Sequence, residues 1–443
     1  MNNQILETIR QKLGDAVRVG FPMMTRRDAG VSTLKGKAHA VIGMRRAGKT
    51  CFLFQNLASR LQQGIERERL VYFNFEDERL AGWRAEELGW LTEEYYREFP
   101  QFRHRAEVIW CLDEIQVIPG WERFVRRMLD EEKVEIFLSG SSARMLSREV
   151  ATSMRGRAME TVITPFSFRE FLRSRQWPDG APGGLPSSTQ RSELRKHFDA
   201  YLAVGGFPEA TACEDDRQRV SLLQGYVDTV LFRDVAERHQ VANLPALRAF
   251  VRQLLRNPAT LFSVSKIHAD FTSRGIPVSK ESLLGYLAYL EDAFLVFTVP
   301  LSDRSERRRQ VNPRKLYLAD HGLALAFSPT AAMDRGHLIE NLVACELSRH
   351  SRDMGYVKTA AGYEVDFLVT GFDGSRQLIQ VAADITSAKT YEREIRALAE
   401  ASKTFKDATA LLLCDTSPPS VTTVPKGITI LPVWQWLTCL RTH

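Results

Sequence analysis

Gly43-Met44-Arg45-Arg46-Ala47-Gly48-Lys49-Thr50 is the stretch that decides the fold of this chain. It follows the pattern G-x-x-x-x-G-K-[ST] of a phosphate-binding loop. Residues 37–42 before it are expected to form a short buried strand, and residues 51–61 after it carry apolar side chains at helical spacing. Strand, glycine-rich turn and helix together form the geometry in which backbone N–H groups wrap around phosphates. The stretch therefore predicts nucleotide binding.

The chemistry of this loop assigns ATP and Mg²⁺ as its ligands. Lys49 is expected to pair with the β- and γ-phosphate oxygens, and the Thr50 hydroxyl is expected to bind Mg²⁺. The whole stretch, with Cys51 directly after it, is predicted to contact the nucleotide.

Two adjacent carboxylates follow a second hydrophobic strand at residues 107–112. In a phosphate-loop ATPase, Asp113 would hold Mg²⁺ directly or through water, and Glu114 would polarise the attacking water. The alternative is an acidic pair that only caps the next element. A glutamate directly after the aspartate indicates a hydrolytic ATPase, and not a kinase or a GTPase with an Asp-x-x-Gly switch.

A further strand, at residues 134–138, runs into Ser139 and Ser141. A polar residue at this strand end commonly senses the γ-phosphate in ATPases of the AAA+ type. The alternative is an N-cap for the turn at residues 143–147. Arg155 and Arg157 come next, and either is a candidate arginine finger for a neighbouring subunit. A solvated charge or a contact within the same chain remains equally open.

The composition, 44% hydrophobic and 26% charged residues, is that of a soluble globular protein. The length of 443 residues predicts two to four domains. The net charge of +6 permits contact with nucleic acid without requiring it. Six cysteines without metal-ligand spacing predict reduced thiols and a cytoplasmic protein. No stretch approaches about 18 consecutive apolar residues, so no membrane span or membrane partner is predicted.

Alternation of strands and helices predicts a parallel sheet covered on both faces. The expected strands are residues 38–42, 70–75, 107–112, 134–138 and 160–163. Farther on, Gly206 and Pro208 mark a sharp turn after a helix. Such a turn contacts the adenine and ribose in several ATPase lineages, and the other interpretation is a turn alone.

Residues 244–300 predict three helices, at 244–257, 263–271 and 279–291, with a serine cap on the second. Strands at 294–299 and 315–318 would form wings around the basic segment 304–314. This is a winged helix-turn-helix pattern. One interpretation is DNA binding, in which Ser279, Lys280 and Ser282 begin the recognition helix. The other is a lid or packing module of the ATPase.

The last third predicts a helix at residues 336–347 and three strands at 356–359, 362–369 and 377–382. Glu340, Asp366 and Gln380 on these elements resemble the restriction-endonuclease-like core. That active site needs two acids for Mg²⁺ and a lysine at position 382, where this chain has alanine. We therefore expect a nuclease fold without nuclease activity and with nothing at the place of the lysine. The acidic residues Glu364, Asp366 and Asp384 then serve as strand-edge and cap carboxylates.

The chain resembles a large prokaryotic family of ATPases that join an AAA-type P-loop domain to a C-terminal domain of unknown function. The resemblance is carried by Gly43–Thr50, Leu112–Glu114, Ser139–Ser141, Pro165–Phe171, Gly205–Glu209, Phe232–Asp234, Asn312–Tyr317, Glu340–Asn341 and Glu364–Phe367. It implies an α/β fold: a P-loop ATPase domain with a parallel sheet at residues 1–210, a helical winged-helix domain at 211–330 and a nuclease-like α/β domain at 331–443.

Two functions remain open. The first is an ATP-hydrolysing, ring-forming homo-oligomer that acts on DNA as a motor or remodeller, through the winged helix and basic segments. The alternative is a nucleotide-controlled switch that acts on a protein partner, of the stress or phage-defence type.

Overall fold

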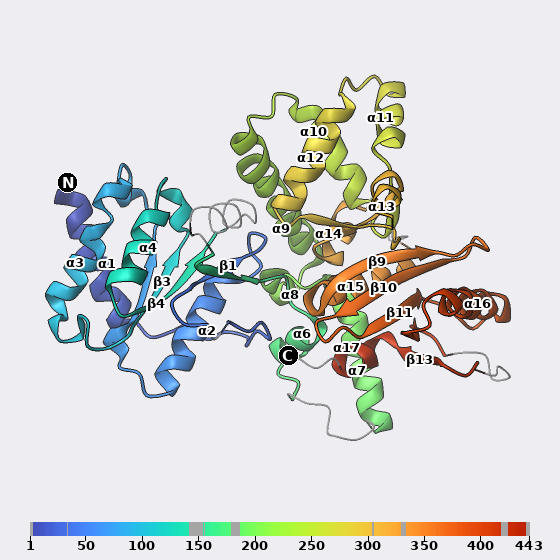
Figure 1. Ribbon diagram of the computed structural model, residues 1–443, viewed down its shortest axis with the longest axis horizontal. Helices are drawn as coiled ribbons and strands as arrows, with labels where there is room; N and C mark the ends of the chain where they lie inside the picture. Colours follow the sequence, from blue (N-terminus) through green and yellow to red (C-terminus); the bar gives the residue numbers. More distant parts are fainter. Residues whose placement is uncertain are drawn as a thin grey trace. The chain divides into compact units, whose positions relative to one another are not determined.

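The structure is a computed structural model that describes residues 3–32, 34–140, 154, 156–178, 187–303, 305–328, 334–417 and 424–439. The chain forms two compact units (Figure 1). The first holds residues 1–164 with 292–294, and the second holds residues 165–291 with 295–442. The predicted domain boundaries at residues 210 and 330 stay predictions.

The first unit is built on a five-stranded parallel sheet, as predicted. Its strands are β1 (Ala38–Ile42), β2 (Leu70–Asn74), β3 (Val108–Asp113), β4 (Val134–Ser139) and β5 (Ala158–Val162). Their order in the sheet is β2-β3-β4-β1-β5. Every residue of β1 and β3 is buried, which explains why both read as continuous apolar runs and not as alternating ones.

Helices cover both faces of this sheet (Figure 1). They are α1 (Asn3–Arg18), α2 (Lys49–Gln62), α3 (Gly89–Glu98) and α4 (Glu122–Glu131). Alternate strand residues such as Ala40, Phe73 and Trp110 join α1, α3 and α4 in one core. Cys111 points to the opposite face, where its Sγ lies 4.0 Å from the Leu53 carbonyl oxygen of α2. Short 3-10 turns complete the unit: η1 (Arg67–Arg69), η2 (Glu78–Leu80), η3 (Ala85–Glu87), η4 (Pro100–Phe102) and η5 (Ile115–Val117).

The second unit contains a three-stranded antiparallel sheet in the order β6-β8-β7. Its elements are α10 (Leu244–Leu255), β6 (Thr260–Phe262), α11 (Val264–Ser273), α12 (Lys280–Asp292), β7 (Val296–Val299), α13 (Glu306–Val311) and β8 (Arg314–Leu318). The three predicted helices and two predicted strands are confirmed at these positions, whereas β6 and α13 were not predicted. Ser263 stands at the N-cap of α11, but its hydroxyl makes no capping hydrogen bond, so the predicted serine cap is wrong.

A second, mixed sheet follows, in the order β13-β12-β11-β10-β9. Its strands are β9 (Ser351–Lys358), β10 (Glu364–Gly371), β11 (Arg376–Ala382), β12 (Ala408–Cys414) and β13 (Ile428–Pro432). The first three pair antiparallel, and β11, β12 and β13 pair parallel. The helices α15 (Arg335–His350) and α17 (Val433–Cys439) share a core with one face, and α16 (Ala388–Thr404) packs on the other.

The remaining helices of the second unit are α6 (Phe168–Ser174), α7 (Ser188–Val204), α8 (Pro208–Ala212), α9 (Asp216–Thr229) with its π-helical continuation η6 (Val230–Glu237), and α14 (His321–Phe327). A reciprocal cap begins α6: the Glu170 backbone N–H donates to Ser167 Oγ, and the Ser167 N–H donates to the Glu170 carboxylate. Among the residues that the structure describes, no helix has the length and apolar character needed to cross a membrane.

Candidate nucleotide-binding site

The phosphate-binding loop turns on two glycines that no other residue could replace without strain. Gly43 has φ 142° and Gly48 has φ 100°, backbone conformations that side chains disfavour. A Cβ on Gly43 would also lie 2.1 Å from the Ile163 carbonyl oxygen. The loop therefore passes close to the end of β5 as it leaves β1. Gly48 is the N-cap residue of α2.

Lys49 lies under this loop and is almost fully buried. Its Nζ donates hydrogen bonds to the carbonyl oxygens of Gly43, at 2.9 Å, and Met44, at 3.1 Å. The ammonium is thus held inside the loop, where its charge faces the space that the loop encloses. Around it, Arg45 is half-buried, while the side chains of Arg46 and Cys51 are exposed.

Asp113 is the centre of the site. Its carboxylate is 1% exposed and accepts hydrogen bonds from three hydroxyl groups. Thr50 Oγ1 lies 2.9 Å and Tyr72 Oη 2.7 Å from its Oδ2, and Ser139 Oγ donates to its Oδ1. The structure therefore brings together three predicted site residues that lie far apart in the sequence: Thr50, Asp113 and Ser139.

The strand order explains this meeting. Because β4 lies between β1 and β3, the carboxyl end of β4 is next to both the phosphate-binding loop and the end of β3. Ser139 pairs in register with Val41 of β1, and Leu138 with Leu112 of β3. Ligands of parallel sheets bind at such carboxyl ends.

Glu114 leaves the sheet in a left-handed conformation, with φ 55°. Its backbone N–H donates to Ser139 Oγ at 3.2 Å, and Gln116 Nε2 donates to its carboxylate. Burial raises the pKa of Glu114, the charge of Asp113 adds to the rise, and Lys49 opposes it. A raised pKa makes this carboxylate a stronger base, as expected of a residue that takes a proton from water.

The oxygens of Thr50 and Asp113 fit Mg²⁺, which prefers hard oxygen ligands. They come from different elements and already lie 2.9 Å apart. At this separation one cation could contact both oxygens.

Two residues of this site escaped the sequence analysis, Tyr72 and Arg27. Burial and the neighbouring charge of Asp113 raise the pKa of the Tyr72 hydroxyl, so it stays a donor. Arg27 is 4% exposed; its guanidinium donates to the carbonyl oxygens of Ala47, at 2.7 Å, and Thr164. Arg27 lies in a segment without periodicity, and only its contacts show that it braces the loop.

Several predicted residues are not brought to this site. Ser141 and Arg155 lie outside the described residues. The guanidinium of Arg157 pairs with Asp130 of α4 in the same chain, and both side chains are about half exposed. This contact matches the interpretation of Arg157 as a contact within the chain, and its role as an arginine finger stays a prediction.

Gly206 and Pro208 belong to the second unit. The Gly206 N–H donates to Asp320 Oδ2 at 2.7 Å, and a Cβ on Gly206 would lie 2.4 Å from the Phe166 carbonyl oxygen. Pro208 occupies the first turn of α8. Packing alone accounts for both residues, and their predicted contact with adenine stays a prediction.

A second cluster of buried charges lies between β8 and the sheet of β9 to β13. Lys315 Nζ lies 2.7 Å from Asp366 Oδ1, 3.0 Å from Glu340 Oε1 and 3.0 Å from Glu364 Oε1. Tyr317 Oη also donates to Glu340 Oε1, at 2.8 Å. The predicted pair Glu340 and Asp366 therefore does meet, around an ammonium group.

The sequence analysis expected no cation near these carboxylates, because position 382 is alanine. That expectation is wrong, since the Lys315 ammonium contacts all three. The ammonium comes from β8, which the sequence pattern assigned only to a wing. Burial opposes its charge, but Asp366, Glu340 and Glu364 outweigh burial and raise the pKa of Lys315. Burial and the Asp366 charge raise the pKa of Glu340, and Lys315 opposes the rise.

In this cluster the Lys315 ammonium contacts one oxygen of each of the three carboxylates, so a metal ion would have to compete with it. Gln380 is also engaged: its Nε2 donates to Glu394 at 2.9 Å and its Oε1 accepts from the Asp366 N–H at 3.2 Å. In the part of the chain that the structure describes, no group of three or more histidine, cysteine or acidic side chains is arranged to hold a metal ion.

Comparison with protein families assigns three consecutive regions. An AAA domain matches residues 35–172, a domain of unknown function (DUF8612) matches residues 195–334, and another domain of unknown function (DUF4143) matches residues 335–436. The phosphate-binding loop, Asp113, Glu114 and Ser139 all lie inside the AAA match.

Similar proteins occur in distant organisms. An uncharacterized protein of Methanocaldococcus jannaschii is 33% identical over 420 residues, which cover 93% of this chain and 90% of the relative. An uncharacterized protein of Haemophilus influenzae is 29% identical, covering 78% of this chain and 82% of the relative. Among solved structures, C. elegans PCH-2 aligns over 53% of this chain and 63% of its own with a TM-score of 0.25 and 12% identity, a likeness too low to carry an argument.

Lys315→Ala tests whether the ammonium replaces a metal ion. We expect the variant to lose about 3–5 kcal/mol of unfolding free energy, because Glu340, Asp366 and the partly exposed Glu364 lose their counter-charge. Mn²⁺ should then restore part of the melting temperature of the variant and leave wild type unchanged in scanning calorimetry without nucleotide. Lys358→Ala is the control: Lys358 is exposed and 4.0 Å from Glu364, so a loss of at most about 1 kcal/mol is expected. Equal stabilisation of wild type by Mn²⁺ would contradict this account.

Proposed function

This chain belongs to the same protein family as the uncharacterized Methanocaldococcus jannaschii protein and carries an AAA domain, and from that premise we propose that it is a Mg²⁺-dependent ATPase. The observation that carries the proposal is the hydrogen bond between Thr50 and Asp113. This bond joins the first turn of α2 to the acidic end of β3. A nucleotide bound with its cation needs the hydroxyl of the loop and the carboxylate of the strand next to each other.

Each residue of the site has a distinct task in this proposal. The N–H groups of residues 43–51 hold the phosphates, and Lys49 exchanges its contacts with loop carbonyls for the β- and γ-phosphate oxygens. Thr50 and Asp113 hold Mg²⁺, which when bound neutralises charge on the phosphates. Glu114 orients the attacking water and accepts its proton.

Neighbouring hydroxyls keep these groups in place. Ser139 donates to Asp113 and accepts from the Glu114 N–H, so it joins the metal ligand to the base. This position also suits a residue that responds to the γ-phosphate. Tyr72 restricts the Asp113 carboxylate from the side of β2.

Replacing Lys49 and Glu114 separates binding from hydrolysis. Lys49→Ala should abolish ATP binding or turnover, because it removes charge that faces the phosphates. Glu114→Gln should bind ATP normally and lose turnover by a factor on the order of a hundred or more, because the water loses its base. Calorimetry and steady-state phosphate release measure the two effects. Phosphate release near the wild-type rate in Glu114→Gln would exclude the role given to Glu114.

Oligomer formation is part of the same proposal. We propose a homo-oligomeric ring in which Arg155 or Arg157 reaches the γ-phosphate bound by the next subunit, since an arginine supplied in trans stabilises transition-state charge. For Arg157 this requires that its pairing with Asp130, both of them near the surface, opens on assembly. Surface ion pairs of this kind contribute at most about 1 kcal/mol and can exchange.

The middle of the chain supports a winged helix. The order α10-β6-α11-α12-β7-β8, with β8 between β6 and β7, gives three helices against a small antiparallel sheet. Ser279 and Lys280 are exposed and Ser282 is half-buried at the start of α12, and the Ser282 N–H donates to Ser279 Oγ at 3.1 Å. We propose that this region associates with DNA; a lid or packing module of the ATPase is the alternative.

For the last domain we propose a nuclease-like fold that does not cut nucleic acid. Its support is the helix-strand-strand-strand-helix-strand order of α15, β9, β10, β11, α16 and β12, together with the uncharged Gln380, whose amide is engaged by Glu394 and by the Asp366 N–H. Incubation with Mg²⁺ or Mn²⁺ and plasmid, linear and branched DNA tests this. Cleavage that disappears in Asp366→Ala would contradict it.

A DNA-associated motor or remodeller is the function we favour, and a nucleotide-controlled switch on a protein partner is the alternative. A motor should hydrolyse ATP several-fold faster with duplex, single-stranded or branched DNA, and its particles should grow to a ring when ATP is added. The two measurements are phosphate release with and without each DNA, and light scattering with Glu114→Gln, which retains ATP. Slow hydrolysis that ignores all DNA would favour the switch, and a monomer with bound ATP would exclude the ring.

A further inference from the structure

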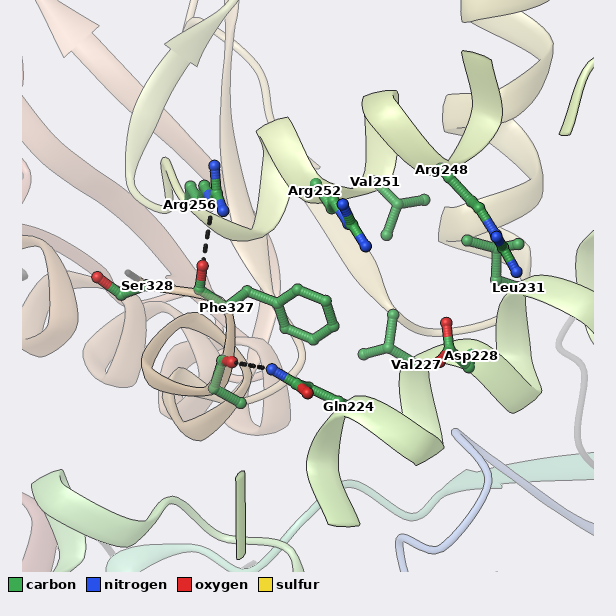
Figure 2. Close-up of a pocket in the computed structure, with 11 residues that line it drawn as sticks. Gln224, Val227, Asp228, Leu231, Arg248, Val251, Arg252, Arg256, Phe327 and Ser328 are labelled. Carbon is green, nitrogen blue, oxygen red and sulfur yellow. Dashed lines mark hydrogen bonds between the residues drawn. The ribbon is translucent and has the colours of Figure 1, made fainter. Parts of the chain in front are cut away.

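Three arginines form a row along α10 in the second unit. Arg248, Arg252 and Arg256 follow one another at intervals of four residues, so they lie on one helix face about 6 Å apart along the axis. All three are exposed. They border a hollow of about 430 Å³ whose other side is formed by α9 and the end of α14 (Figure 2).

Apolar side chains, one of them aromatic, also line this hollow. Val227 and Val251 line it, and Figure 2 shows the ring of Phe327 directed toward them. The backbone of Phe327 is fixed by a hydrogen bond, in which Arg256 Nε donates to the Phe327 carbonyl oxygen at 3.0 Å. The ring is half-buried, so one part of it remains accessible to a ligand.

A second hollow, of about 390 Å³, continues along the same helix. It shares Arg248 and Arg252 with the first and contains Phe232 on η6. The guanidinium of Arg248 lies over the Phe232 ring, 4.8 Å from its centroid. Two adjacent hollows thus repeat one combination, a half-buried aromatic ring beside arginines on a shared helix.

We propose that the row Arg248, Arg252 and Arg256, with Phe232 and Phe327, binds single-stranded nucleic acid. Such strands are held by a positive surface that follows the phosphates and by aromatic side chains on which bases stack. Here the three arginines supply the positive surface, and the rings of Phe232 and Phe327 supply the stacking side chains. This inference rests on the proposed association with DNA and names a site for it that lies outside Ser279, Lys280 and Ser282 of α12.

The shape of the site favours a single strand over a duplex and over an acidic protein segment. Paired bases have no free faces to offer Phe232 and Phe327, whereas unpaired bases do. A row of carboxylates would match the arginines and leave the two rings without a stacking partner. Asp228 of α9 also lines the first hollow, and its charge repels any anion there.

Fluorescence anisotropy with labelled oligothymidylate and with a duplex of equal length tests the proposal. We expect the single strand to bind more tightly than the duplex. Arg252→Gln should weaken binding on the order of fivefold, whereas Arg217→Gln, an exposed arginine at the start of α9 outside both hollows, should not. Asp228→Asn should tighten binding, because it removes a repelling charge.

The double variant Arg248→Gln/Arg252→Gln keeps the bond between Arg256 and Phe327. It should reduce the salt dependence of single-strand binding, the slope of log K against log salt, by about 1.4. Phe327→Leu should weaken binding at least about fivefold and Phe327→Tyr should retain it, because stacking needs the ring.

Four results would overturn the inference. Unchanged binding by the double variant would place the site elsewhere and leave the proposed DNA association standing. A wild-type protein that binds neither DNA form would end both proposals, while its ATP hydrolysis is measured separately. If the duplex binds more tightly than the single strand and the double variant loses this binding, the site binds duplex DNA and the proposed preference for a single strand is wrong. Displacement of the oligonucleotide by equimolar polyglutamate would indicate an acidic protein segment instead.

Discussion

The Asp113 carboxylate is the constraint on which the nucleotide site depends. A buried carboxylate is stable only when its oxygens are hydrogen-bonded, and here three hydroxyls from three separate elements meet that need. Thr50 fixes the helix after the loop, Tyr72 fixes β2 and Ser139 fixes β4. The same bonds that make the buried charge tolerable hold the loop, the proposed metal ligands and Glu114, the proposed base, in one arrangement.

The two buried acidic centres of this chain differ in what balances their charge. Around Asp113 the donors are neutral hydroxyls, which can turn aside and leave oxygens for a cation. Around Asp366, Glu340 and Glu364 the donor is the Lys315 ammonium, a charge that cannot leave because it is anchored in β8. The first centre is therefore suited to binding Mg²⁺ reversibly, and the second holds two parts of the fold together.

Local patterns predicted much of this structure, and long-range contacts account for what they missed. The loop at residues 43–50 and the runs at 107–112 and 134–138 located three strands of the sheet, because a buried parallel strand is apolar throughout. Thr50, Asp113 and Ser139 could be matched to known motifs. Tyr72, Arg27 and Lys315 could not, because each acts on groups distant in sequence and none lies in a motif that names its partner.

The central claim is that Asp113 and Thr50 hold the cation of a bound nucleotide, and ATP affinity with and without Mg²⁺ tests it most directly. Isothermal titration of ATP into wild type and Asp113→Asn, each in excess Mg²⁺ and in EDTA, gives four affinities. The account predicts that Mg²⁺ tightens binding to wild type at least about tenfold and that Asp113→Asn loses this gain, while both proteins bind ATP equally in EDTA. An Asp113→Asn protein that keeps the full gain from Mg²⁺ would contradict it.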